Sequence, residues 1–133
     1  MTHRQFNLLV WALRLIAAVI MLQTLFFKFT ASPESVYIFS KLGIEPWGRI
    51  GIGIAELISV ILLLIPRTTS IGALLAVGIM AGALLSHFTM LGIVVQNDGG
   101  ELFLLALLVF IISSILVFIF RKNLISVLPF VKK

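Results

Sequence analysis

Four apolar runs contain almost none of this chain's charged residues, and that distribution constrains the fold more than any motif does. The runs cover Phe6–Phe27, Ile50–Ile65, Ile71–Leu91 and Leu102–Phe120. A chain that is 61 % hydrophobic and only 11 % charged cannot cover such runs in water. We therefore expect an all-α integral membrane protein, in which residues 1–133 form one domain, a bundle of four transmembrane helices.

The two longer connections between these runs carry helix signals of their own. In the first, Ser32 is a favourable N-cap and Pro33 suits the first helical position. Gly43 then provides a stop. This pattern predicts a short interfacial helix between spans 1 and 2, lying on the membrane surface or capping the bundle. The second connection, Gln96–Glu101, is typical of a turn followed by a helix start, with Asp98 as the best cap.

The basic residues are divided unequally between the two sets of span ends. One set carries Arg4, Arg14, Arg67, Arg121, Lys122, Lys132 and Lys133. All five acids lie toward the other set, beside Lys28, Lys41 and Arg49. The positive-inside rule then places a multi-pass protein in the cell membrane with both termini cytoplasmic. The net charge of +5 is explained by this asymmetry, so the expected partner is the lipid bilayer and not nucleic acid.

The two ends of the chain allow competing interpretations. A short basic lead before the first run resembles a secretory signal peptide, but Arg14 interrupts that run and Pro33 follows the small residues after it. We expect the first span to be retained. The apolar tail, Leu124–Lys133, is expected to lie along the cytoplasmic lipid surface.

The absence of cysteine limits the chemistry that the chain can perform by itself. Without thiols it forms no disulfide and holds no iron–sulfur cluster through its own thiolates, so a redox role requires a bound cofactor. No close pair such as His-x-x-x-His indicates a metal site, and none is expected. A haem with two histidine ligands would need a second intramembrane His, and His3 lies too near the span end.

Polar side chains recur at a similar depth in the outer half of the predicted bundle. The residues are Gln23, Thr24 and Lys28 in span 1, Arg49 and Glu56 in span 2, and His87 in span 3. Ionisable groups inside a membrane are costly to hold without a partner, which makes them candidates for function. We expect these six residues to form an outward-facing polar pocket that binds a ligand.

Glu56 and His87 each allow two interpretations. Glu56 can form an internal ion pair with Lys28 or Arg49 that fixes helix packing, or it can bind ligand or handle protons. His87 can relay a proton or bond a carbonyl-bearing ligand, because imidazole titrates near neutral pH. It can equally be a packing histidine. The sequence leaves both alternatives open.

Charged and small residues in the spans also carry packing predictions. Arg14 and Lys28 are expected to snorkel to opposite membrane surfaces. Two series, Gly51-Ala55-Ser59 and Gly78-Gly82-Ser86, repeat every four residues and predict close backbone approach between helices. Spans 2 and 3, joined by the turn at Pro66, are expected to be neighbours.

Several of these residues together carry a family resemblance over about Arg14 to Phe120. Its marks are Arg14 early in span 1, Lys28 in Leu25-Phe26-Phe27-Lys28-Phe29, Ala55-Glu56-Leu57 followed by the basic turn Pro66-Arg67, and the small-residue-rich third span ending at Ser86-His87. The chain resembles the DoxX family of small four-helix bacterial membrane proteins. That resemblance implies a location in the bacterial inner membrane. It also implies a redox-associated role close to quinone, beside a partner oxidoreductase subunit.

The leading hypothesis is a membrane protein that binds a small apolar ligand with a polar head, such as a quinone. Glu56 and His87 would contact the head group, while Lys28 and Arg49 would balance charge. The alternative is a non-enzymatic membrane scaffold or assembly factor for a partner complex, in which Glu56 locks the bundle. Catalytic residues, any enzymatic reaction and a homo-oligomeric state stay open at this point.

Overall fold

The computed structural model describes residues 1–127, and the regular structure within them is entirely helical. The predicted tail lies outside the described residues from position 128 onward. The elements are α1 (His3–Phe29), α2 (Pro33–Lys41), α3 (Trp47–Leu64), the 3₁₀ turn η1 (Pro66–Thr68), α4 (Thr69–Ser86), the π-helical turn η2 (His87–Leu91), α5 (Glu101–Ile119) and α6 (Arg121–Val127).

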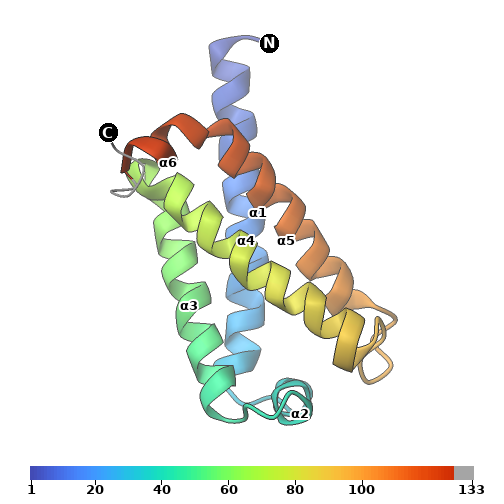
Figure 1. Cartoon of the computed structure of the whole chain (residues 1–133). Coiled ribbons are helices and arrows are strands. Elements are labelled where there is room, and N and C mark those ends of the chain that lie inside the picture. The colour runs from blue at the N-terminus through green and yellow to red at the C-terminus, as the bar shows by residue number, and fades with distance from the viewer. Residues whose placement is uncertain (128–133) are drawn as a thin grey trace.

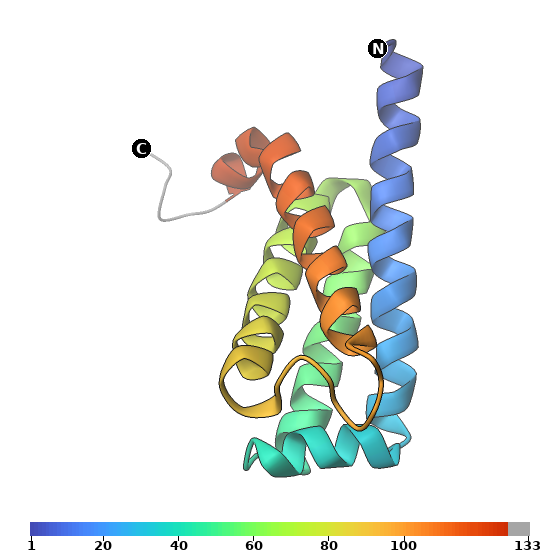
Figure 2. The ribbon, with the colours of Figure 1, turned by 90° about the vertical axis from the view of Figure 1, so that its right-hand side faces the viewer.

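Four of these segments are long and apolar enough to cross a membrane: α1, α3, the continuous η1–α4–η2 segment, and α5. The predicted four-span architecture is therefore confirmed. The predicted short helix is also confirmed, because Ser32 Oγ accepts the Ser35 N–H and Pro33 is the first residue of α2. Figures 1 and 2 show α2 lying across one end of the bundle, with α6 at the other end. We call these the α2 end and the α6 end.

The four spanning helices form a ring in which each packs against two neighbours. Helix α1 contacts α3 and α5, and α4 contacts the same two helices. The centre is filled by fully buried side chains such as Ala17, Met21, Ala76, Val109 and Leu116. Small residues there let the helix backbones approach closely, and that packing supplies the driving force for association in lipid.

Close backbone approach between α3 and α4 occurs beside the η1 turn. A Cβ atom added at Gly72 would lie 2.5 Å from the Leu63 backbone nitrogen. Ser59 Oγ also donates to the Gly72 carbonyl at 2.8 Å. The prediction that spans 2 and 3 are neighbours is confirmed, since α3 and α4 pack together.

The small-residue prediction is wrong for the glycines that carried it. Cβ atoms added at Gly51, Gly78 and Gly82 would meet nothing within 4 Å, so these positions face open space and not another backbone. The reason is geometric: α3 and α4 are close near η1 and diverge toward the α2 end (Figure 1). Recurrence at four residues identifies one side of a helix but does not identify what that side contacts.

Arg14 does not snorkel to a membrane surface as predicted, because it is 3 % exposed inside the bundle. Its Nε donates to the Leu63 carbonyl at 2.7 Å, and its guanidinium lies 3.6 Å from the centre of the Trp11 ring. The last carbonyls of a helix lack intrahelical partners and carry partial negative charge. Thr69 Oγ1 also donates to Leu63, at 3.1 Å, so the C-terminus of α3 attracts the arginine inward.

Candidate functional site

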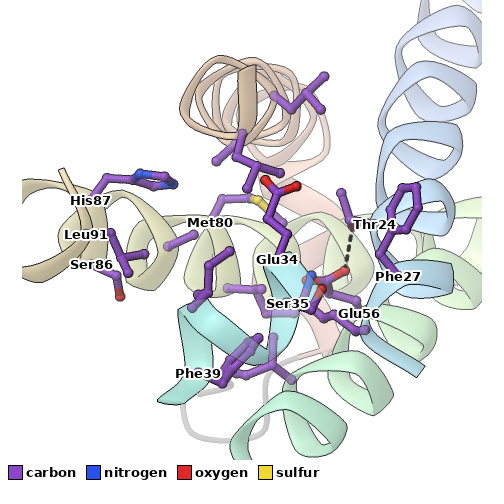
Figure 3. Close-up of a pocket in the computed structure, with 18 of the residues that line it drawn as sticks. Thr24, Phe27, Glu34, Ser35, Phe39, Glu56, Met80, Ser86, His87 and Leu91 are labelled. Carbon is purple, nitrogen blue, oxygen red and sulfur yellow. Dashed lines mark hydrogen bonds and ion pairs between the residues drawn. The ribbon is translucent and has the colours of Figure 1, made fainter. Parts of the chain in front are cut away.

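A cavity of about 760 Å³ lies at the α2 end of the bundle, and residues from all five helices α1–α5 line it. Most of its lining is apolar, including Met21, Ile38, Phe39, Met80 and Val109. Figure 3 shows α2 beside the cavity, with Glu34, Ser35 and Phe39 drawn from it. The short helix thus covers the end of a space that the spanning helices leave open.

The sequence-predicted residues divide into those that line the cavity and one that does not. The lining includes Gln23, Thr24, Lys28, Glu56 and His87, and it excludes Arg49. Figure 3 places His87 on one side, the hydrogen-bonded pair of Thr24 and Glu56 on the other, and Met80 between them. The two most informative polar residues therefore share a cavity without contacting each other in the structure.

Glu56 is 2 % exposed and is fully paired with α1. Its Oε1 lies 2.9 Å from Lys28 Nζ, and its Oε2 accepts a hydrogen bond of 3.1 Å from Thr24 Oγ1. The internal ion pair between spans 1 and 2, one of the two sequence interpretations, is therefore present. Lys28 consequently does not snorkel to the surface as predicted, because the buried carboxylate draws its ammonium inward.

Arg49 is buried outside the cavity and helps to join two helix ends. Its Nε lies 2.9 Å from Glu45 Oε1, and its Nη1 donates to the Lys28 carbonyl in the last turn of α1. A cation at this position complements the negative end of the α1 dipole. Its contacts thus position Lys28 through the backbone, and Arg49 itself does not pair with Glu56.

His87 is 6 % exposed and begins the η2 turn, where the helix widens. Its Nδ1 lies 2.8 Å from the Gly92 carbonyl oxygen. Because a carbonyl only accepts hydrogen bonds, the proton of the neutral ring is assigned to Nδ1. Nε2 then keeps a lone pair, and no hydrogen bond joins it to any residue within 1–127.

The sequence reading missed the polar groups that α2 and the η2–α5 loop contribute. Ser32, Glu34, Ser35 and Gln96 all line the cavity. The Ser32-Pro33-Glu34 pattern identified a helix, but no local signal could show that this helix folds over a cavity.

Burial raises the pKa of the Glu34 carboxyl, and the negative charges of Asp98 and Glu101 raise it further.

Asp98 organises the loop that closes the cavity near His87. Its Oδ1 accepts the N–H groups of Val95 and Gly100 at 3.0 and 2.8 Å, and its Oδ2 accepts that of Leu102 at 3.2 Å. Burial by itself raises the pKa of Asp98, but these three bonds and the nearby His87 outweigh burial and lower it. Asp98 is not the N-cap of α5 as predicted, because Gly100 holds that position, but its Oδ2 does accept the N–H of Leu102 in the first turn of that helix.

The raised pKa of Glu34 predicts a pH-dependent stability. The folded protein binds this proton more tightly than the unfolded chain, so stability falls as pH rises above 4.5, the ordinary pKa of a glutamate. Glu34→Gln should therefore melt at a higher temperature than the parent near pH 7, with the difference shrinking toward pH 4. Thermal melts across that range in one detergent measure the effect. If the melting temperature of Glu34→Gln exceeded that of the parent by more at pH 4 than at pH 7, the raised pKa of Glu34 would be contradicted.

Within residues 1–127, no group of three or more His, Cys, Asp or Glu side chains is placed to hold a metal ion.

The fold and the cavity define a multi-pass integral membrane protein, a four-helix bundle with a largely apolar cavity at one end. The sequence profile of the DoxX-like family matches residues 12–119, and the chain belongs to that family. Searches of the curated proteins and of the solved structures found no match.

Proposed function

We propose that the cavity binds a small lipid-soluble molecule with a polar head, a quinone, and that the protein has a redox-associated role. The observation that carries this proposal is a cavity of about 760 Å³ lined by His87, a buried residue whose imidazole Nε2 has no hydrogen-bond partner within residues 1–127. Ligand sites usually have roughly 300–1,000 Å³, mostly apolar walls and a few placed polar groups. The volume and the lining both support binding of this ligand class.

The state of His87 suits both forms of a quinone head group. A neutral ring with its proton on Nδ1 presents Nε2 as an acceptor, which fits the hydroxyl of a quinol. The protonated ring presents an N–H at the same place, which fits the carbonyl of a quinone. His87 can therefore hydrogen-bond either form of the head group through Nε2.

On the opposite wall, Lys28, Glu56 and Thr24 form a paired polar group. An ammonium donates three hydrogen bonds, and Glu56 takes up one of them, so Lys28 keeps donors for a second oxygen of the head group. Gln23, also in the lining, adds an amide near the same wall. Arg49 contributes by holding the α1 terminus that carries Lys28.

The proposal extends to the orientation and the setting of the protein. At the α6 end lie Arg4, Arg67, Arg121 and Lys122, which the positive-inside rule assigns to the cytoplasm. The cavity then faces outward in the bacterial inner membrane. As the family resemblance implies, electrons would pass between the bound quinone and a partner oxidoreductase subunit.

Quinone retention tests the head-group assignment. Purified His87→Ala should retain about tenfold less quinone than the parent, because one desolvated hydrogen bond of about 1–1.5 kcal/mol is lost. Mass spectrometry of extracted ligand, normalised to folded protein, measures the ratio. Thr89→Ala is the matched control, because within residues 1–127 Thr89 Oγ1 bonds only to the Leu85 carbonyl, and Thr89 lies outside the lining. A well-folded parent without quinone would refute the proposal, as would equal retention in His87→Ala.

The scaffold alternative rests on the buried pair that joins α1 to α3. If Glu56 serves only to lock the bundle, Glu56→Gln lowers thermal stability and recovery of a partner together. If Glu56 also supports ligand binding, Glu56→Gln loses quinone at a temperature where its fold and partner persist. Measuring the three quantities on one preparation separates the two functions.

A further inference from the structure

Two glycines of α4 belong both to the cavity wall and to the outer surface of the bundle. Gly78 and Gly82 line the cavity, yet both are exposed. A Cβ atom added at either position would meet nothing within 4 Å. The cavity therefore reaches the outside of the bundle beside these glycines, where the wall has no side chains.

The position of this gap follows from the way α3 and α4 pack. The two helices are in close contact at Gly72 and Leu63 and diverge toward the α2 end (Figure 1). On the α3 side, Ile52 also lines the cavity. We call the space bounded by Ile52, Gly78 and Gly82 the side opening. All three residues lie in segments long and apolar enough to cross a membrane, and on that ground we assign the side opening to the lipid-facing side of the bundle.

We infer that the ligand enters sideways from the bilayer through the side opening and that it carries a long apolar tail, which stays in the opening when the head is bound. The inference rests on the proposed function and deepens it by naming the ligand class, a tailed lipid-soluble molecule. A tail needs an apolar exit from the cavity, and the side opening supplies one. The imidazole of His87, 94 % buried with Nε2 free, marks the head-group position.

The spacing along α4 supports this arrangement. His87 lies five residues beyond Gly82, which corresponds to roughly 7–8 Å along a helix axis at 1.5 Å per residue. A quinone ring that is hydrogen-bonded to Nε2 of His87 can therefore direct its apolar tail toward Gly82. The small side chains of Ala83 and Ser86, also in the lining, leave the path between them open.

Filling the opening tests the inference without altering the polar groups. Parent, Gly82→Leu and Gly51→Leu proteins are reconstituted in nanodiscs and loaded with ubiquinone or with the same benzoquinone head group lacking a tail. Gly51 is the matched control, because it is also exposed, also has nothing within 4 Å of an added Cβ, and lies outside the lining. Bound quinone is quantified after removal of excess ligand, and circular dichroism checks folding.

We expect Gly82→Leu to reduce ubiquinone occupancy at least tenfold while head-group binding stays within twofold of the parent. Gly51→Leu should match the parent for both ligands. Equal ubiquinone binding by Gly82→Leu and the parent would overturn the side opening while leaving the proposed function intact. A folded parent that binds neither ligand would overturn the proposed function itself. If Gly82→Leu fails to fold, Gly78→Leu makes the same test at the neighbouring position.

Discussion

Replacing Lys28 with methionine is expected to lower the free energy of unfolding by about 3–5 kcal/mol, the range for breaking a buried ion pair by removing one partner. The substitution leaves the carboxylate of Glu56, which is only 2 % exposed, without the ammonium 2.9 Å away. Thr24 still donates one hydrogen bond to Glu56, but one neutral donor does not compensate a buried charge. Denaturant titration in a fixed detergent, followed by circular dichroism, measures the loss.

The matched control also removes the charge of Glu56, the carboxylate that Lys28→Met leaves unpaired. Lys28→Met combined with Glu56→Gln keeps the size of both side chains and removes both charges, so we expect it to recover much of the lost stability. The difference between the double variant and the two single variants gives the coupling energy of the pair. Additive losses in the double variant would show that Lys28 and Glu56 are not coupled.

Gly72→Ala is expected to destabilise the bundle by about 1–3 kcal/mol, the usual range for overpacking a well-packed interior. The added methyl group would lie 2.5 Å from the Leu63 nitrogen and 2.9 Å from the Leu62 carbonyl carbon, and both are backbone atoms that cannot rotate away. The helices must then separate, which also weakens the hydrogen bond from Ser59 to the Gly72 carbonyl. The same denaturant titration measures this effect.

Gly51→Ala is the control for the Gly72 substitution. An alanine at this exposed helical position meets no atom within 4 Å, and alanine favours helix over glycine by roughly 0.5–1 kcal/mol. We therefore expect it to leave stability unchanged or slightly raised. Equal effects at positions 51 and 72 would contradict close α3–α4 contact beside η1.

Much of the candidate site could be predicted because depth in a membrane can be counted along a helix. Counting residues from the span ends placed Thr24, Lys28, Glu56 and His87 at one level, and the structure brings all four to one cavity. The same counting could not choose between Lys28 and Arg49 as the partner of Glu56. That choice depends on how α1 and α3 are rotated about their axes, which only their packing sets.

The contributions of α2 and of the glycines show where residue patterns alone were insufficient. Helix signals identified α2, but its placement over the cavity also depends on contacts with η2, which lies more than forty residues further along the chain. The spacing of Gly78 and Gly82 was interpreted as a packing face because small residues usually serve that purpose in lipid. Because α3 and α4 diverge, Gly78 and Gly82 instead lie at an opening. The divergence depends on how the two helices pack, so the sequence of α4 alone does not indicate it.

Composition by itself determined that this chain resides in lipid as four helices, because long uncharged runs must satisfy their backbone hydrogen bonds within each segment. The short capping helix was also determined locally, since Ser32 and Pro33 define its first turn. Only the tertiary structure decided that Arg14 turns inward to the end of α3, that Glu56 pairs with Lys28, and that His87 keeps one nitrogen free. Each of these outcomes depends on which partner another helix brings within hydrogen-bonding distance, and no single helix encodes that distance.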